Sequence, residues 1–139
     1  MPNSSTGQVA IKFGIEGPSL TITTACAASA NALGEAKILI ENGIVDIVVA
    51  GGTESGTTPM TIGAFAQIRA LSTKNDSPES ACSPFDKDRD GFVMAEGSTV
   101  LVLEEEESAK KRGAKIYGYV TGYGLSLIHI SEPTRLRRT

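Results

Sequence analysis

The stretch TTACAAS at residues 23–29 joins two segments of different composition. Before it, residues 20–23 (LTIT) are mostly β-branched, which is typical of a strand. After it, residues 27–42 are rich in Ala, Leu, Glu and Lys, which favour a helix. Cys26 therefore lies at a predicted strand-to-helix turn, where the unpaired amides and the positive end of the helix dipole favour a thiolate. Position alone leaves open the alternative of a buried cysteine that fills a tight turn.

A second predicted strand follows this helix. Residues 44–50 (IVDIVVA) are mostly β-branched, which is typical of a strand covered on both faces in a parallel sheet. Gly43 stands where a helix ends, and the Gly51-Gly52 pair ends the strand. The order strand, helix, strand predicts a βαβ unit and an α/β fold. The small residues in the first turns of the helix predict that it is largely buried and that a ligand can approach Cys26.

Beyond residue 52, composition and hydrophobic periodicity predict five further segments. They are a helix over 61–71, a surface loop over 72–84, a strand over 99–104, a helix over 105–112 and a strand over 116–123. We expect the last strand to pair antiparallel with its neighbour. Residues 1–10 carry no strong pattern.

Composition excludes several classes of function. With 139 residues, 40% of them hydrophobic, the chain is long enough to bury the core of one ordinary domain. A formal net charge of −3 argues against nucleic acid or an anionic membrane as partner. The two cysteines have no metal-ligand spacing, so no metal site is expected. No secretory signal and no apolar run of membrane-spanning length are present, which predicts a cytoplasmic protein.

Residues 86–91 (DKDRDG) resemble the first half of a calcium-binding EF-hand loop. The twelfth position, which needs a bidentate Glu, is Gly97. Residues 77–84 hold two prolines and cannot form the helix that enters such a loop. We therefore expect a charged loop in which neighbouring aspartates hold Arg89 and Gly91 takes an unusual backbone angle.

Four sequence motifs occur in order between residues 7 and 125. They are GPS at 17–19 with TACA at 24–27, VAGGTE at 49–54, RALS at 69–72, and SPFDKDRDGFV at 83–93 with Glu96-Gly97. In this order and spacing they resemble the motifs of β-ketoacyl synthases. The likeness is greatest to the 3-oxoacyl-[acyl-carrier-protein] synthase II type, which KKRGAK at 110–115 fits as well.

The resemblance implies a fold and a reaction. The fold would be the thiolase-like layered αβαβα fold, an α/β fold. Residues 1–126 would supply the later part of its N-terminal half and the start of its C-terminal half. Cys26 would accept an acyl group from the phosphopantetheine arm of acyl carrier protein, with its own N–H as one oxyanion donor. Decarboxylative Claisen condensation with malonyl-acyl carrier protein would then extend the chain in fatty acid biosynthesis. The protein would need no cofactor of its own.

The resemblance also assigns roles to other residues. Phe65 would line the acyl pocket, and Arg69 would lie near the pocket mouth and meet the acidic carrier protein. Plain core packing of Phe65 and a solvated helix-face position of Arg69 remain open as alternatives. Residues 20–23 would lie at a homodimer interface. Cys82 has no catalytic counterpart.

The family uses two histidines for decarboxylation, and they are missing here. The single histidine is His129, which does not lie in the family's histidine motif. Agreement with the family stops near residues 124–126, and residues 127–139 resemble translated adapter sequence, with a natural basic tail as the alternative. We therefore expect this chain not to catalyse condensation, even if Cys26 is acylated.

Three other functions are open to a chain with these motifs. The first is a polyketide ketosynthase. The second is a non-catalytic chain-length-determining partner, against which the presence of Cys26 speaks because such subunits lack the nucleophile. The third is an α/β module with an inert cysteine.

Overall fold

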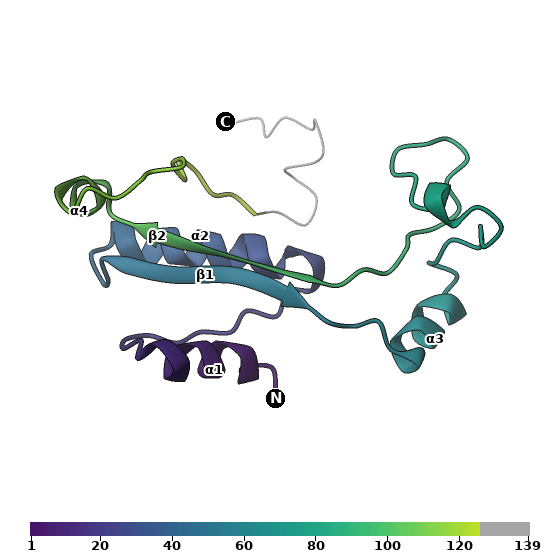
Figure 1. The fold of residues 1–139 in the computed structure, drawn as a ribbon, viewed down its shortest axis with the longest axis horizontal. Coiled ribbons are helices and arrows are strands. Elements are labelled where there is room, and N and C mark those ends of the chain that lie inside the picture. The colour runs from purple at the N-terminus through teal and green to yellow at the C-terminus, as the bar shows by residue number, and fades with distance from the viewer. Residues whose placement is uncertain (126–139) are drawn as a thin grey trace, which may run out of the picture. The chain divides into compact units, whose positions relative to one another are not determined.

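A computed structural model describes residues 1–125 of the chain. They form two compact units, one made of Met1–Gly52 with the chain from Val100 onward and the other of Thr53–Thr99. The elements are α1 (Ser4–Phe13), the 3₁₀ turn η1 (Ala25–Ala27), α2 (Ala28–Glu41), β1 (Ile47–Glu54), α3 (Pro59–Gln67), the 3₁₀ turn η2 (Pro78–Ser80), β2 (Gly97–Glu104) and α4 (Glu106–Lys111). Figure 1 labels the α-helices and the strands.

Helix α2 confirms the predicted helix after Cys26. It ends in a Schellman motif, in which Gly43 takes a φ of 64°. The Gly43 and Ile44 amides donate to the carbonyls of Ile40 (2.9 Å) and Leu39 (3.0 Å). Only three α2 residues are buried, namely Asn31, Gly34 and Ala36. The prediction of a largely buried helix is therefore wrong. Small residues allow other segments to pack closely against a helix, but burial also requires such segments, and the described residues cover only part of α2.

Strands β1 and β2 form a two-stranded sheet. They run in opposite directions (Figure 1), and the Glu105 amide continues the ladder by donating to the Asp46 carbonyl at 3.1 Å. The parallel partner predicted for β1 is not present among residues 1–125. β1 also continues through Gly51 and Gly52 instead of ending there. A Cβ on Gly52 would lie 2.6 Å from Ser29 Cβ, so this strand glycine marks a close approach of β1 to the first turn of α2.

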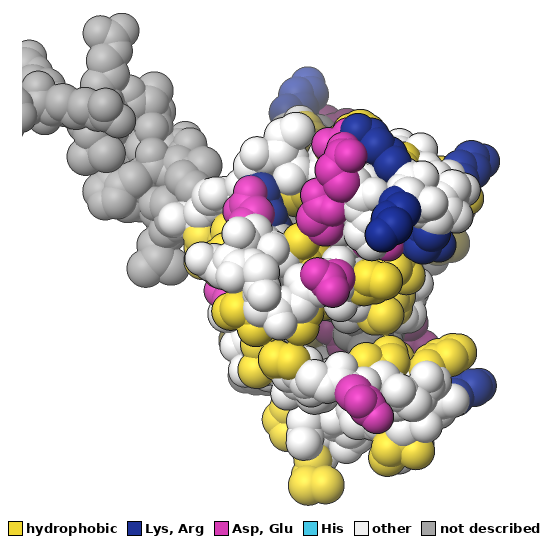
Figure 2. Space-filling view, turned by 90° about the vertical axis from the view of Figure 1, so that its left-hand side faces the viewer, with side chains coloured by type: hydrophobic (Ala, Val, Ile, Leu, Met, Phe, Trp, Pro, Cys, Tyr) yellow, Lys and Arg dark blue, Asp and Glu magenta, His cyan; other side chains and the backbone are white. Residues whose placement is uncertain are grey.

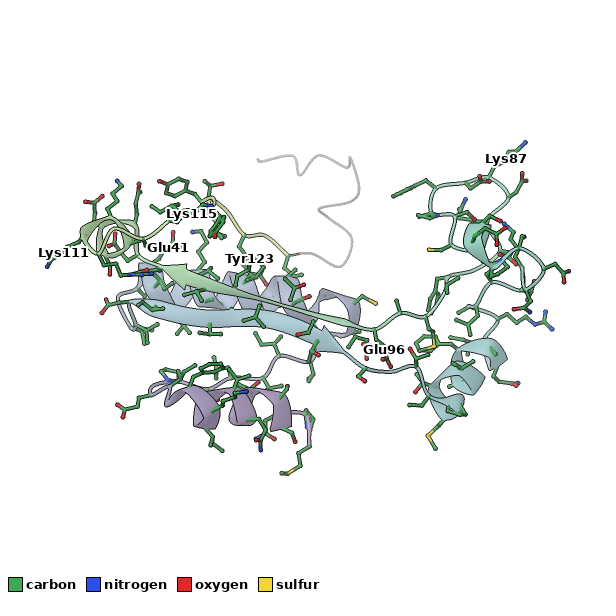
Figure 3. The ribbon with its side chains drawn as sticks, in the orientation of Figure 1. Glu41, Lys87, Glu96, Lys111, Lys115 and Tyr123 are labelled. Atoms are coloured by element: carbon green, nitrogen blue, oxygen red, sulfur yellow. The ribbon has the colours of Figure 1, made fainter. Side chains whose placement is uncertain are left out.

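Two predicted strands are absent from the described part of the chain. Residues 20–23 and 116–123 carry strand-like composition but join no ladder within residues 1–125. Composition favours an extended chain, whereas a strand also requires a neighbour's backbone groups. The predicted βαβ unit is therefore not formed among the described residues. Tyr123, labelled in Figure 3, contacts α2 at Gly34, where a Cβ would overlap its ring.

The sequence predicts helix α4 but not helix α1. Helix α1 is not indicated by the pattern of residues 1–10. None of its residues is buried, and its large apolar residues Ile11 and Phe13 are 78% and 69% exposed. Helix α4 matches the predicted helix over 105–112, and Gly113 ends it with a φ of 71°. None of the helices in residues 1–125 is long and apolar enough to cross a membrane.

The core within residues 1–125 is small. The buried hydrophobic residues are Ala36, Ala50, Ala81 and Ala109. Many larger apolar side chains reach the surface, as the yellow atoms of Figure 2 illustrate. The buried hydrophobic positions among the described residues are therefore all alanines.

Helix α3 lies in the second unit and is shorter than predicted. Thr58 caps its first turn, with the side-chain oxygen accepting from the Thr61 amide at 3.3 Å, and Pro59 occupies the first turn. The helix ends at Gln67 rather than at residue 71. The predicted loop over residues 72–84 is confirmed, with η2 as a single short turn within it.

Candidate active site

Cys26 lies in the turn η1, immediately before α2, and is exposed. The alternative of a buried cysteine is therefore wrong. Ala25 takes a φ of 51°, a left-handed conformation that costs an L-residue about 1–2 kcal/mol. The Ala27 amide donates to the Thr24 carbonyl at 3.2 Å and closes the turn. This sharp turn places Cys26 on the surface at the start of the helix.

The start of α2 can stabilise negative charge near Cys26. The helix has 14 residues, and its dipole puts partial positive charge at this end. Within residues 1–125, no backbone acceptor pairs with the Cys26 N–H. That amide therefore has no backbone acceptor to give up, and its role as an oxyanion donor, which the resemblance implies, stays a prediction. The thiolate state of Cys26 stays a prediction.

A buried side chain lies behind the turn. Asn31, on the second turn of α2, is 6% exposed, and its Nδ2 donates to Thr24 Oγ1 at 2.8 Å. The prediction of site residues did not include Asn31. The sequence feature that could have pointed to Asn31 is that it is a single amide side chain among the small and apolar residues that follow Cys26.

Phe65 lies on α3 and is 36% exposed. Its ring meets that of Phe92 edge-on, with 5.3 Å between the centroids and 81° between the planes. Phe92 comes from the motif at residues 83–93. Phe65 therefore packs on one aromatic side chain and is partly exposed, and its role as a pocket wall stays a prediction.

Arg69 lies just beyond the end of α3 and is exposed. Its φ of 56° is left-handed, and its amide donates to the Ala66 carbonyl at 2.9 Å. The Ala70 amide donates to the Phe65 carbonyl at 3.0 Å, which completes the same motif that ends α2. The alternative of a helix-face arginine is therefore wrong, because Arg69 takes the position that glycine usually occupies after a helix.

The motif at residues 83–93 is joined to the segment that follows Arg69. The Phe92 amide donates to the Ala70 carbonyl, and the Ser72 amide donates to the Phe92 carbonyl, both at 3.0 Å. A Cβ on Gly91 would overlap the backbone of Leu71 and Ser72, so only glycine fits this close crossing. The unusual backbone angle predicted for Gly91 is confirmed by its φ of 155°, and the close crossing of the two segments explains why glycine is needed there.

Asp90 fastens the same two segments. Its Oδ2 accepts from the Thr73 amide at 2.8 Å and from the Thr73 hydroxyl at 3.0 Å. Hydrogen bonds from Ser72 and Thr73 lower the pKa of Asp90 to about 2. Arg89 donates to the Asp86 carbonyl at 2.7 Å. Arg89 is therefore held through the backbone of an aspartate and not through the carboxylates that the sequence suggested.

The predicted site residues fall into the two units. Cys26 belongs to the first, and Phe65 and Arg69 belong to the second, where they lie on either side of the end of α3. Cys82 is an exposed free cysteine in the second unit. Within residues 1–125, no three His, Cys, Asp or Glu side chains are grouped to hold a metal ion. His129 and the tail at 127–139 lie outside the described residues.

A family model and curated relatives of similar sequence point to the same family. The family described as "Beta-ketoacyl synthase, N-terminal domain" matches residues 1–109. A 3-oxoacyl-[acyl-carrier-protein] synthase 2 from Synechocystis sp. is 51% identical over 133 residues, which cover 94% of this chain and 32% of the relative. The mitochondrial 3-oxoacyl-[acyl-carrier-protein] synthase of Arabidopsis thaliana is also 51% identical, over 94% of this chain and 29% of the relative. The chain thus spans about a third of the length of these relatives.

Solved structures give the same fold. A type II polyketide ketosynthase in complex with its acyl-carrier protein superposes with a TM-score of 0.80 at 43% identity, over 83% of this chain and 28% of that chain. A beta-ketoacyl synthase from Burkholderia phymatum superposes with a TM-score of 0.79 at 37% identity, over the same shares. The predicted thiolase-like α/β fold class is confirmed by these neighbours, and the described residues form part of it.

Proposed function

The chain belongs to the β-ketoacyl synthase family, and from this premise we propose that Cys26 is the acyl-accepting nucleophile of a condensing enzyme. The acyl donor is the phosphopantetheine arm of an acyl carrier protein, and the protein needs no cofactor of its own. The complete enzyme then extends the acyl group with malonyl-acyl carrier protein in fatty acid biosynthesis. The observation that carries the proposal is the exposed thiol at the start of α2.

The first half-reaction follows from the geometry of the turn. The Cys26 thiolate attacks the thioester carbonyl, and the oxygen of the tetrahedral intermediate takes up negative charge. The Cys26 amide and the start of α2 stabilise that charge. The intermediate collapses, the bond to the phosphopantetheine sulfur breaks, and the departing thiolate takes a proton. An acyl thioester remains on Cys26.

Acylation can be tested on the 139-residue chain. It is incubated with acyl carrier protein that carries a medium-length saturated acyl chain, and peptides are then analysed by mass spectrometry. We expect the acyl mass on the peptide that contains Cys26. The Cys82→Ser variant should keep this signal and Cys26→Ser should lose it. Equal acylation of the two cysteines, or none on Cys26, would contradict the proposal and favour a module with an inert cysteine.

Two residues of the second unit recognise the substrate in this proposal. Phe65 lines the acyl pocket, supported by its partly exposed ring beside Phe92. Arg69 meets the acidic carrier protein, supported by its exposed position after α3. Condensation is not expected of this chain, because its one histidine lies outside the family's histidine motif.

We place the enzyme in the cytoplasm as a homodimer, in which residues 20–23 pair with a second copy. In support, Leu20 is 57% exposed and this segment joins no ladder within residues 1–125. A lysine on a strand edge opposes such pairing. Sedimentation should therefore give a monomer for Leu20→Lys and a dimer for the control Ile11→Lys, which changes a 78% exposed residue on α1. Dimers of both variants would contradict this interface.

A polyketide ketosynthase is the second candidate function. It is supported by the 43% identity to a type II polyketide ketosynthase. The 51% identity to synthases of the 3-oxoacyl-[acyl-carrier-protein] type favours the fatty acid pathway. The two are distinguished by offering acyl carrier proteins of both pathways in the acylation assay and comparing the loading rates of Cys26.

A further inference from the structure

Asn31 is the one buried polar residue among residues 1–125. It lies on α2, a regular helix, and its amide nitrogen reaches back to the hydroxyl of Thr24 at 2.8 Å. Thr24 is the residue whose carbonyl closes the turn around Cys26 by accepting from the Ala27 amide. A single side chain thus links the rigid part of the helix to the turn that carries the thiol.

This turn needs such a link. Ala25 holds a left-handed backbone between Thr24 and Cys26, and a strained backbone persists only where its surroundings over-determine it. The Thr24 side chain makes no capping hydrogen bond to the helix amides. Its oxygen is engaged by Asn31 instead. The Asn31 hydrogen bond thus adds a tertiary link to the local backbone hydrogen bond that the Thr24 carbonyl accepts from the Ala27 amide.

Within residues 1–125, the amide of Asn31 has one unpaired group, which is destabilising, and one group that makes a hydrogen bond. Asn31 Oδ1 is buried and has no hydrogen-bond partner among the described residues. An unpaired buried acceptor is destabilising, and an apolar residue of similar size would avoid it. Packing alone would therefore favour an apolar residue at position 31. The amide gives in return the hydrogen bond from Nδ2 to Thr24.

We propose that Asn31 is a positioning residue for Cys26, whose hydrogen bond to Thr24 holds the turn that sets the thiol and its amide at the start of α2. The inference rests on the proposed function and deepens it. Asn31 does not touch the reacting atoms and acts through Thr24. A misplaced nucleophile loses about 10- to 100-fold in rate even when the displacement is small.

The test compares variants of the 139-residue chain that remove or keep the hydrogen bond. Asn31→Leu and Thr24→Val remove it with little change in volume, and Thr24→Ser keeps the hydroxyl. We expect Asn31→Leu and Thr24→Val to slow acylation of Cys26 by about 10- to 100-fold, and Thr24→Ser to restore most of the rate. The double variant should be no slower than either single variant, because both remove the same link.

Cys82 is the internal reference for thiol reactivity. It is exposed and belongs to the other unit, so its alkylation by iodoacetamide should be equal in all variants. Loss of folding would lower the far-UV circular dichroism, whereas loss of positioning changes only Cys26. If Asn31→Leu loses its helices, the positioning role is tested by comparing the acylation rates of Thr24→Val and Thr24→Ser alone.

The outcomes separate this inference from the proposed function. If the unaltered chain is acylated on Cys26 and the variants without the hydrogen bond react equally fast, the positioning role of Asn31 is overturned and the proposed function stands. If the unaltered chain is not acylated on Cys26, both proposals fall. Slow acylation in Thr24→Val with recovery in Thr24→Ser supports the positioning role.

Discussion

The ring of Phe92 meets the ring of Phe65 edge-on, with 5.3 Å between their centroids. The backbone on either side of this contact is fixed, because Phe92 exchanges hydrogen bonds with Ala70 and Ser72. The motif at residues 83–93 therefore supports α3 from one side. In the proposed enzyme, this motif would hold the pocket wall Phe65 in place.

Phe92→Ala should destabilise the second unit by about 1–2 kcal/mol, because it removes an aromatic pair as well as apolar contact. The control Phe92→Leu keeps most of the apolar bulk and should lose less. Both are measured as the free energy of unfolding in urea. Equal stability of the two variants would mean that the edge-on contact contributes nothing of its own.

Arg69→Gly separates the backbone of Arg69 from its charge. Glycine removes the strain of the left-handed backbone, so stability should stay the same or rise by up to about 1 kcal/mol. Binding to acyl carrier protein should nevertheless weaken, because the guanidinium is gone. Arg69→Ala loses the charge and keeps the strain.

Titration calorimetry with acyl carrier protein, together with urea unfolding, tests both effects of Arg69→Gly. Undiminished binding by Arg69→Gly and Arg69→Ala would exclude Arg69 from the docking surface. A clear loss of stability in both variants would show that the Arg69 side chain matters for folding, whereas a loss in Arg69→Gly alone would contradict the expected relief of backbone strain.

The helix ends were predictable because their signals are local. Gly43 and Gly113 end α2 and α4 in the left-handed conformation that glycine adopts without strain. Arg69 takes the same conformation without the glycine, and the predicted helix accordingly ran too far. A sequence shows which residue prefers a conformation, but not where the tertiary structure imposes it.

The strands and the Asn31 link were less predictable because they depend on distant partners. Residues 20–23 have the composition of a strand and no ladder within residues 1–125. The Gly51-Gly52 pair looks like the end of a strand, yet β1 continues through it, and α2 lies close to Gly52. Cys26 stands out from its local turn together with the motifs that resemble those of the family, whereas Asn31 is recognised only once the helix brings it to Thr24.

Glu104 should make the stability of the first unit depend on pH. Hydrogen bonds from Arg112, at 2.6–3.0 Å, and from Ser108 lower the pKa of Glu104. Because the folded pKa lies below the unfolded one, this contribution is fully present above the unfolded pKa, near 4.5, and is lost as the pH falls through the folded pKa. Acid should therefore weaken the attachment of α4 to β2.

Glu104→Gln isolates this effect, because glutamine keeps the shape and does not titrate. Urea midpoints measured from pH 7 down to pH 3 should fall less steeply in Glu104→Gln than in the unaltered chain. The control Glu79→Gln changes an exposed carboxylate of η2 and should leave the slope unchanged. Parallel slopes in Glu104→Gln and the unaltered chain would contradict a role for this ion pair.

Gly52→Ala tests whether the contact between β1 and α2 supports the site. The added Cβ would lie 2.6 Å from Ser29 Cβ and 3.5 Å from Ser29 Cα, so the strand and the helix must separate. Such overpacking costs about 1–3 kcal/mol. Gly97→Ala is the control, since a Cβ at this strand glycine meets nothing within 4 Å.

The position of Ser29 gives Gly52→Ala a second expected effect. Ser29 lies on the first turn of α2, directly after the turn that carries Cys26. A shift of this turn should therefore slow acylation of Cys26 in Gly52→Ala by more than the loss of folded protein explains, while Gly97→Ala should react normally. Urea unfolding and the mass-spectrometric acylation assay measure the two effects separately. A variant that is less stable but fully reactive when folded would show that β1 supports the fold and leaves the thiol's position to Asn31 and Thr24.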